Sequence, residues 1–463
     1  MDKNTFIEMI AKIKKILLTP IALPSVDGGV VIKEDCMSNW ALEFEIHPTK
    51  IIFPTREGEY VDAPDKIVIG SEYSLTYPGT ASMKCVVIYQ EDFNLFIGGE
   101  PSYEYTQIVL KRVSTKKFHL KFISKRHHFI IIPFAEEWTD VIDTYRSYFG
   151  LKTEEKRTSK PRYMLQLGIK DSFKNVYIKH FDELKPAIEL FRANFGAGNI
   201  IHFFGTNKDG FDRMFPDYTI DPALGGDEGF KDLLHFAESL NLQTSHHYNP
   251  RIADSNWMKR FPEFQSAIVK KDGRNVLEPY KDHPHFVMNL NADIWFNRCF
   301  ETVLYLKNLG FSYLEIDQFT YQRNFYQPES PLALGYKRMV DEFIRLGINF
   351  WLEGVSDIFR LPTGNFYQIL IRDKSQLWEN NENRRGYPYG KTYAQFFMSL
   401  HPDSEVSYQI FTEHKLFDLL PERFNSARQN KAAVYDIELG FYDENYLNNL
   451  NRVISILKEH GEI

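Results

Sequence analysis

Two short segments of the chain, FSYLEID at residues 311–317 and INFWLEG at residues 348–354, decide the fold that the sequence predicts. Each is a mostly apolar run with a carboxylate at its end, which is typical of a strand buried in a parallel sheet. The stretch between them has the apolar spacing of a helix. Together they predict a strand–helix–strand unit in which Asp317 and Glu353 stand at the carboxyl ends of neighbouring strands.

The side chains of both segments alternate in the same phase. Leu314 and Ile316 share a face that would pack on outer helices, whereas Glu315 and Asp317 share the face that would point into a barrel. The alternation repeats over 348–353, with Glu353 on the inner face. Polar groups on an inner face are costly unless they are hydrogen-bonded or lie at the open mouth. Two carboxylates directed at one mouth therefore predict a functional site.

Strands and helices continue to alternate from Pro161 onward, which predicts an α/β fold with a (β/α)8 barrel. A doubly wound sheet would need a glycine-rich phosphate turn after its first strand, and GIKDS at 168–172 is not one. The predicted strands are 163–169, 199–205, 243–249, 311–317, 348–353, 366–373, 393–400 and 432–436. The predicted helices are 182–194, 229–240, 294–309, 334–346 and 444–460.

The first third of the chain has a different pattern. Between residues 28 and 135, short runs alternate apolar and polar residues and are divided by turn clusters, which predicts an antiparallel β-sandwich. A polar linker over 152–160 follows. We therefore expect two domains, a β-sandwich domain with a leading helix at residues 1–150 and the barrel at residues 161–463.

Composition excludes several classes of protein. The net charge is −7, with 62 acidic and 55 basic residues, which argues against a nucleic-acid partner. Cys36, Cys85 and Cys299 are far apart and lack the spacing of metal ligands, so we expect no disulfide framework, no metal and no cofactor.

Membrane association is not expected either. No apolar run approaches the ~18 residues of a membrane span. Lysines interrupt the apolar residues of 1–23, which favours a surface helix over a signal peptide, the alternative being a helix that lies on a membrane. We expect a cytoplasmic protein, and the sequence predicts no oligomeric state.

The inner-face carboxylates match the needs of glycosidic bond cleavage. A retaining glycosidase uses two carboxyl groups about 5–5.5 Å apart, one ionised as nucleophile and the other protonated as acid. Asp317 suits the nucleophile and the longer Glu353 suits the acid. The alternative is that both are structural carboxylates paired with arginine. Glu315, one layer deeper, is expected to be a buried partner, and Asp357 and Asp373 are alternative acids.

Further candidates for substrate binding lie near other strand ends. Adjacent His246 and His247 would point to opposite faces of a strand, which argues against a shared metal, and the loop 208–212 resembles a calcium loop only weakly. We expect Tyr248, Asn249 and Arg251 to line the mouth of the barrel, although Arg251 could instead pair only with Asp254. Trp257 and Trp351 are expected to be either platforms for a sugar ring or core residues. Asp436 is expected to contact a substrate hydroxyl or to act as a helper carboxylate.

Several motifs resemble a group of glycoside hydrolase-like barrels: FPDY at 215–218, GGDEGF at 225–230, YNPR at 248–251 and IDQ at 316–318. LTYPG at 75–79, VIY at 87–89 and LFIG at 95–98 resemble the β-supersandwich that precedes those barrels. The group is similar to the α-N-acetylgalactosaminidases and, more distantly, to the α-galactosidase clan.

The resemblance implies roles for particular residues. In the α-N-acetylgalactosaminidases the nucleophile is an Asp after the fourth strand and the acid/base is a Glu after the fifth, positions that Asp317 and Glu353 match. In the α-galactosidase clan the acid/base is an Asp further on, which would favour Asp373.

We therefore expect a retaining α-glycosidase. The family pattern includes a C-terminal β-domain and a secretion signal that we do not expect here, which favours a small oligosaccharide or glycoside as substrate. The alternatives are a non-catalytic carbohydrate-binding protein and a transglycosidase that uses the same residues.

Overall fold

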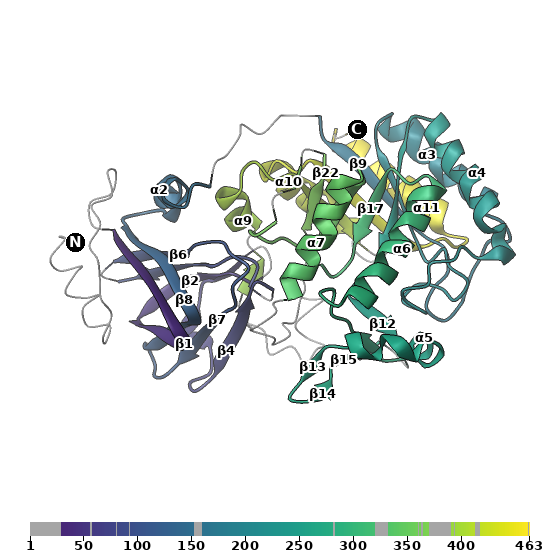
Figure 1. Cartoon of the computed structure of the whole chain (residues 1–463). Helices are drawn as coiled ribbons and strands as arrows, with labels where there is room; N and C mark the ends of the chain where they lie inside the picture. Colours follow the sequence, from purple (N-terminus) through teal and green to yellow (C-terminus); the bar gives the residue numbers. More distant parts are fainter. Residues whose placement is uncertain are drawn as a thin grey trace.

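The structure is a computed structural model whose two main sheets are a closed barrel of eight parallel strands and a nine-stranded antiparallel sheet (Figure 1). It confirms the predicted fold class. The residues described are 29–55, 58–79, 81–91, 93–151, 160–280, 283–319, 332–359, 361–362, 364–369, 390–392, 394–412, 417–461 and 463.

The antiparallel sheet is built almost wholly from the first third of the chain. Its order is β20-β3-β2-β5-β6-β8-β7-β4, and β1 runs along β8. In β8, Phe118, Leu120 and Phe122 are buried at alternate positions, as expected of a strand with one face in a core. The strands are β1 (Val30–Ile46), β2 (Pro48–Phe53), β3 (Glu59–Val61), β4 (Glu72–Tyr77), β5 (Cys85–Gln90), β6 (Asn94–Gly99), β7 (Thr106–Arg112), β8 (Phe118–Phe134) and β20 (Gly390–Thr392).

The barrel closes in the order β10-β11-β17-β18-β19-β21-β22-β9. Its strands are β9 (Arg162–Gly168), β10 (Ile200–Phe204), β11 (Gln243–Tyr248), β17 (Tyr313–Ile316), β18 (Asn349–Glu353), β19 (Phe366–Ile369), β21 (Val406–Thr412) and β22 (Val434–Phe441). The helices around it include α3 (Lys185–Phe195), α4 (Gly226–Ser239), α6 (Asp293–Leu309), α7 (Leu332–Arg345), α10 (Leu420–Gln429) and α11 (Tyr446–Glu459). Between β11 and β17 the chain also forms α5 (Ser255–Arg260) and a small sheet of β12 (Ile252–Asp254), β15 (Leu277–Glu278) and β16 (His285–Val287).

The predicted seventh strand is wrong. Residues 394–400 form the helix α9 (Ala394–Leu400), and the seventh strand is β21, which begins at Val406. The segment places Phe396, Phe397 and Leu400 at helical spacing, and all three are buried. A short apolar run does not distinguish a helix from a buried strand. The seven residues of this segment are therefore too few for the spacing of apolar residues to predict the secondary structure.

Two further expectations concern strand ends. The eighth strand starts at Val434 and continues to Phe441, so Asp436 lies near its beginning and not at its end. The sixth strand ends at Ile369. Asp373 and the predicted helix within residues 1–23 lie outside the described residues.

The two sheets meet through a shared core. Trp138 packs edge-on against Phe396 of α9, with ring centres 5.1 Å apart. Tyr77 of β4 donates a hydrogen bond of 2.7 Å to Asp357, in the loop after β18. The strand β20, which lies between β19 and β21 in sequence, pairs with β3 of the antiparallel sheet. Within the described ranges, no helix combines the length and apolar character that a membrane crossing requires.

Candidate active site

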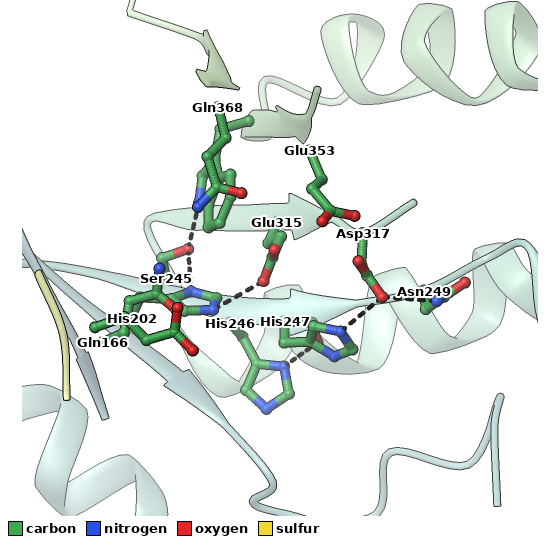
Figure 2. A network of polar contacts seen from close by, with 12 residues as sticks. Gln166, His202, Ser245, His246, His247, Asn249, Glu315, Asp317, Glu353 and Gln368 are labelled. Carbon is green, nitrogen blue, oxygen red and sulfur yellow. Dashed lines mark hydrogen bonds and ion pairs between the residues drawn. The ribbon is translucent and has the colours of Figure 1, made fainter. Parts of the chain in front are cut away.

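The structure brings Asp317 and Glu353 together at the carboxyl ends of the fourth and fifth barrel strands. The parallel strands β17 and β18 pair with Glu315 opposite Trp351, so the residues that follow emerge side by side. Figure 2 shows the two carboxyl groups next to each other, and a side-chain hydrogen bond joins them. The contact needs one proton between the two groups, as an acid and its conjugate base would share it.

Two side chains from β11 and the loop after it hold the Asp317 carboxyl group. Its Oδ2 accepts a hydrogen bond of 2.7 Å from Nδ2 of Asn249 and lies 3.2 Å from Nε2 of His247. The backbone N–H of Asp317 donates to the carbonyl of Tyr248. The Asp317 side chain keeps 14% of its surface exposed, so it is fixed in orientation but still reachable.

The environment of Asp317 raises its pKa to about 7, chiefly because the carboxyl group is buried. The negative charges of Glu315 and Asp212 raise it further, whereas hydrogen bonds with Glu353 and Asn249 lower it. A hydrogen bond to the ionised form of a carboxyl group lowers its pKa, so the contact with Glu353 favours ionised Asp317.

The carboxyl group of Glu353 is positioned by the residue after Asp317. Its Oε2 accepts a hydrogen bond of 2.8 Å from the backbone N–H of Gln318. Gln318 has a φ of 54°, a left-handed conformation that is unfavourable for a residue with a Cβ. Both ends of its side chain are bonded, with Oε1 accepting from Nη1 of Arg251 at 2.6 Å and Nε2 donating to the hydroxyl of Tyr280.

Arg251 therefore stands behind the carboxylate pair and not at the mouth itself. It is 1% exposed, and its second contact is an ion pair with Glu278 of β15. The expected alternative, pairing with Asp254, does not form; Asp254 instead caps α5 through the backbone N–H of Asn256.

Below the pair lies a buried polar chain on the inner face of the barrel (Figure 2). Glu315 contacts His202 at 2.8 Å, and the other ring nitrogen of His202 contacts Ser245 at 3.0 Å. Burial raises the pKa of Glu315 to about 8 and lowers that of His202 well below its ordinary value. Glu315 thus has the deeper partner position that its place in the strand predicts.

Three predicted aromatic contacts with substrate need correction. Tyr248 is fully buried and donates to the carbonyl of Cys299 in α6, because it lies on the outer face of β11, opposite to His247. Trp257 is 1% exposed and packs on Phe261. Trp351 points into the barrel, as its phase predicts, but it is fully buried and its Nε1 donates to Ser245. All three belong to the core.

Asp436 is also sealed inside the barrel. Its two oxygens accept hydrogen bonds of 2.8 to 2.9 Å from the amides of Gln166 and Gln368, and it has no exposed surface. Burial raises its pKa well above its ordinary value. The expected contact with a substrate hydroxyl fails because β22 extends beyond this residue, which places it one layer below the mouth.

Several residues near the pair were not among the predicted site residues. His247 contacts Asp317 directly, Asp212 acts on it through its charge, and Gln318 and Tyr280 lie behind Glu353. Alternation from Ser245 would have placed His247 on the inner face. Tyr280 lies in the long excursion between β11 and β17, and nothing in its sequence context indicates the contact.

Asp357, an alternative acid, points away from the pair into the contact between the two sheets. The hydroxyl of Tyr77 and the backbone N–H of Lys84 donate to its two oxygens. In the part of the chain that the structure describes, no group of three His, Cys, Asp or Glu side chains is arranged to hold a metal ion.

Comparison with known proteins shows where this fold occurs. The family model that matches is a domain of unknown function, DUF6259, over residues 123–340, so it includes Asp317 but ends before Glu353. No curated protein matches the chain.

Solved structures match almost the whole chain. The α-N-acetylgalactosaminidase NagBb from Bifidobacterium bifidum superposes with a TM-score of 0.66 at 15% identity, over 95% of this chain and 80% of that one. The chain has the fold of α-glycosidases. For the α-galactosidase TtGalA from Thermus thermophilus the TM-score is 0.64 at 11% identity, over 95% of this chain and 92% of that one. For the GH36 α-galactosidase AgaA from Geobacillus stearothermophilus the TM-score is 0.57 at 12% identity, over 94% of this chain and 64% of that one. The resemblance to glycoside hydrolase barrels that the sequence motifs indicate is thereby confirmed at the level of the fold.

Proposed function

We propose that this protein is a retaining α-glycosidase that acts on a small oligosaccharide or glycoside. The observation that carries the proposal is the hydrogen-bonded contact between Asp317 and Glu353 at the ends of adjacent barrel strands. The fold supports it, because the structures that share this fold include an α-N-acetylgalactosaminidase and two α-galactosidases.

In the proposed mechanism, the ionised Asp317 attacks the anomeric carbon of the sugar while Glu353 gives its proton to the leaving oxygen. The glycosyl–aspartate ester is then hydrolysed by water, whose proton returns to Glu353. The hydrogen bonds to Oδ2 of Asp317 from Asn249 and His247 orient the attacking group. The backbone N–H of Gln318 fixes Glu353 on the other side.

The closeness of the two carboxyl groups favours retention of anomeric configuration. Inverting enzymes hold their carboxyl groups about 6.5–9.5 Å apart to leave room for water, whereas retaining enzymes hold them about 5–5.5 Å apart. Groups in hydrogen-bonding contact are nearer to the shorter range. A sugar that enters the site has to replace this contact, so the pair in the free protein marks the place of the glycosidic oxygen.

The test is turnover of p-nitrophenyl α-glycosides, beginning with the α-N-acetylgalactosaminide and the α-galactoside. We expect Asp317→Ala to lose roughly 100-fold or more in rate, with azide restoring turnover and giving the β-glycosyl azide. The matched control is Glu228→Ala, whose side chain is 88% exposed on α4 and lies outside the proposed site.

Glu353 is tested with the leaving group. A nitrophenolate departs without much help from an acid, whereas an alkoxide needs protonation. We expect Glu353→Ala to slow cleavage of an alkyl α-glycoside far more than formation of the covalent intermediate from the nitrophenyl glycoside. Unchanged turnover by both variants, or no cleavage of any α-glycoside by the unaltered protein, contradicts the proposal.

A further inference from the structure

A buried lysine in the antiparallel-sheet domain opens onto a cavity that the proposed reaction does not use. Lys84 precedes β5 and is 2% exposed. The cavity has a volume of about 160 Å³ and is lined by Lys84, Glu100, Pro101, Ser102, Glu104, Arg126 and His128.

The Lys84 side chain is held along its length. A Cβ on Gly99 would lie 2.7 Å from Cγ and Cδ of Lys84, so the absence of a side chain at Gly99 makes the passage for the lysine stem. The ammonium nitrogen lies 5.0 Å from the centre of the Phe129 ring and 5.9 Å from that of Tyr77. Aromatic faces stabilise a cation, but they leave its three N–H donors without strong acceptors.

The carboxylates around the cavity already have other basic side chains as partners. Glu100 lies 2.8 Å from His128, and Glu104 lies 3.1 Å from Arg126. Among the described residues, no oxygen lies within hydrogen-bonding or ion-pair distance of the Lys84 ammonium. Burial lowers the pKa of Lys84 to about 8, and the charges of Glu104, Asp357 and Glu100 raise it only from a distance.

We propose that this cavity binds a small hydroxylated carboxylate of the sugar-acid class, with the carboxylate on the Lys84 ammonium. The Lys84 ammonium lines the cavity without a protein acceptor in the described part of the chain, so an anionic ligand there gains a charge-assisted partner. The cavity holds the volume of about five water molecules at roughly 30 Å³ each, which limits the ligand to one small molecule or one ring.

The lining favours a carboxylate over a phosphate. The Glu100 and Glu104 side chains are 48% and 42% exposed at the rim, where they can accept hydrogen bonds from ligand hydroxyls. The same two negative charges repel a dianionic phosphate more strongly than a monoanionic carboxylate. A ligand with one carboxylate and several hydroxyls would pair its carboxylate with the Lys84 ammonium and donate hydrogen bonds from its hydroxyls to Glu100 and Glu104.

The experiment is calorimetric titration of the full-length protein with D-glucuronate, D-glucose and inorganic phosphate. We expect saturable binding of glucuronate, no binding of glucose, and at least tenfold weaker glucuronate binding by Lys84→Met. The matched control is Lys121→Met, which removes a partly exposed lysine of the same domain from its pair with Glu43 and keeps full affinity. Equal affinity of Lys84→Met and the unaltered protein overturns the proposal, as does phosphate binding without glucuronate binding.

A second measurement needs no variant. Between pH 8 and pH 10 the free Lys84 ammonium loses its proton, so the affinity for glucuronate should fall steeply. Asp357, with its pKa raised to about 7 by burial, is ionised throughout this range. Glu100, Glu104, Arg126 and His128 are the other titratable groups that line the cavity. An affinity that is constant from pH 8 to pH 10 contradicts the role of Lys84.

Discussion

At the residue scale, the proposed chemistry depends on how each oxygen of the carboxylate pair is held. Asn249 shows this most directly, because both polar atoms of its side chain and its backbone N–H have a defined partner. Its Nδ2 donates to Asp317, its Oδ1 accepts from the backbone N–H of Arg251, and its own backbone N–H donates to the hydroxyl of Tyr218. The side chain is thus fixed as a donor to the proposed nucleophile, Asp317.

Replacing Asn249 with Ala should shift the pH dependence of activity. The hydrogen bond from Asn249 lowers the pKa of Asp317, so its loss raises that pKa and leaves less of the ionised nucleophile at low pH. We expect kcat/KM to fall more at pH 6 than at pH 8, with the acidic limb of the profile displaced upward. Asn275→Ala, at an exposed position in β14 (Arg274–Asn275), is the control, and an unshifted limb in Asn249→Ala contradicts the assigned role.

Gln318 should affect catalysis more than binding. Gln318→Gly keeps the backbone N–H and tolerates the φ of 54°, but it removes the contacts to Arg251 and Tyr280 that fix the peptide. We expect kcat to fall roughly tenfold with KM nearly unchanged, since Glu353 then spends less time in the reactive position. A rise in KM with kcat unchanged would assign Gln318 to substrate binding instead.

At the scale of elements, sequence periodicity located the strands that carry the site but not their length. The segments 311–317 and 348–353 are long enough to show which face is polar, and the structure places Glu315, Asp317 and Glu353 on the inner side. The prediction that Asp436 lies at the end of a strand is wrong, because β22 continues past it to Phe441 without a change in the apolar and polar pattern of the sequence. The role of Arg251 was missed because its partner Glu278 comes from a separate small sheet.

The inner face of β17 should make the stability of the protein depend on pH. The folded-state pKa of Glu315 is about 8, above its value of about 4.3 in an unfolded chain, so its contribution to stability is complete below pH 4.3 and is lost as pH rises through 8. Asp317 and Asp357 act in the same direction, with pKa values of about 7.

Glu315→Gln isolates the contribution of that one residue. The amide cannot ionise and keeps a donor near His202, so the decrease in unfolding free energy between pH 5 and pH 8.5 should be smaller than in the unaltered protein. The difference should be on the order of a few kcal/mol at most, measured from urea unfolding at both pH values. Equal pH dependence of the two proteins would mean that Glu315 is ionised in the folded state already at pH 5.

At the scale of the whole molecule, the two sheets are parts of one packed structure. Trp138 packs against Phe396, β20 extends the antiparallel sheet with a segment from the barrel part of the sequence, and Asp357 is held by β4. No local pattern predicts such contacts, because each joins residues more than 200 positions apart. The loop that Tyr77 holds is the one that leaves Glu353, so the antiparallel sheet supports the proposed acid from behind.

Tyr77→Phe tests this support with the loss of one oxygen atom. The Tyr77 hydroxyl donates to Asp357 and accepts from the backbone N–H of Ser102, and all of Tyr77 is buried. Its removal leaves the buried Asp357 carboxyl group and the partly buried backbone N–H of Ser102 with one bond fewer each, which should destabilise the protein by about 1–3 kcal/mol. Without this donor the pKa of Asp357 should rise further, so the loss should be greater at pH 8 than at pH 5. Urea unfolding at both pH values measures this loss in unfolding free energy. Tyr177→Phe is the control, because Tyr177 is 65% exposed. An equal loss at pH 5 and pH 8 would show that the Tyr77 hydroxyl does not stabilise an ionised Asp357.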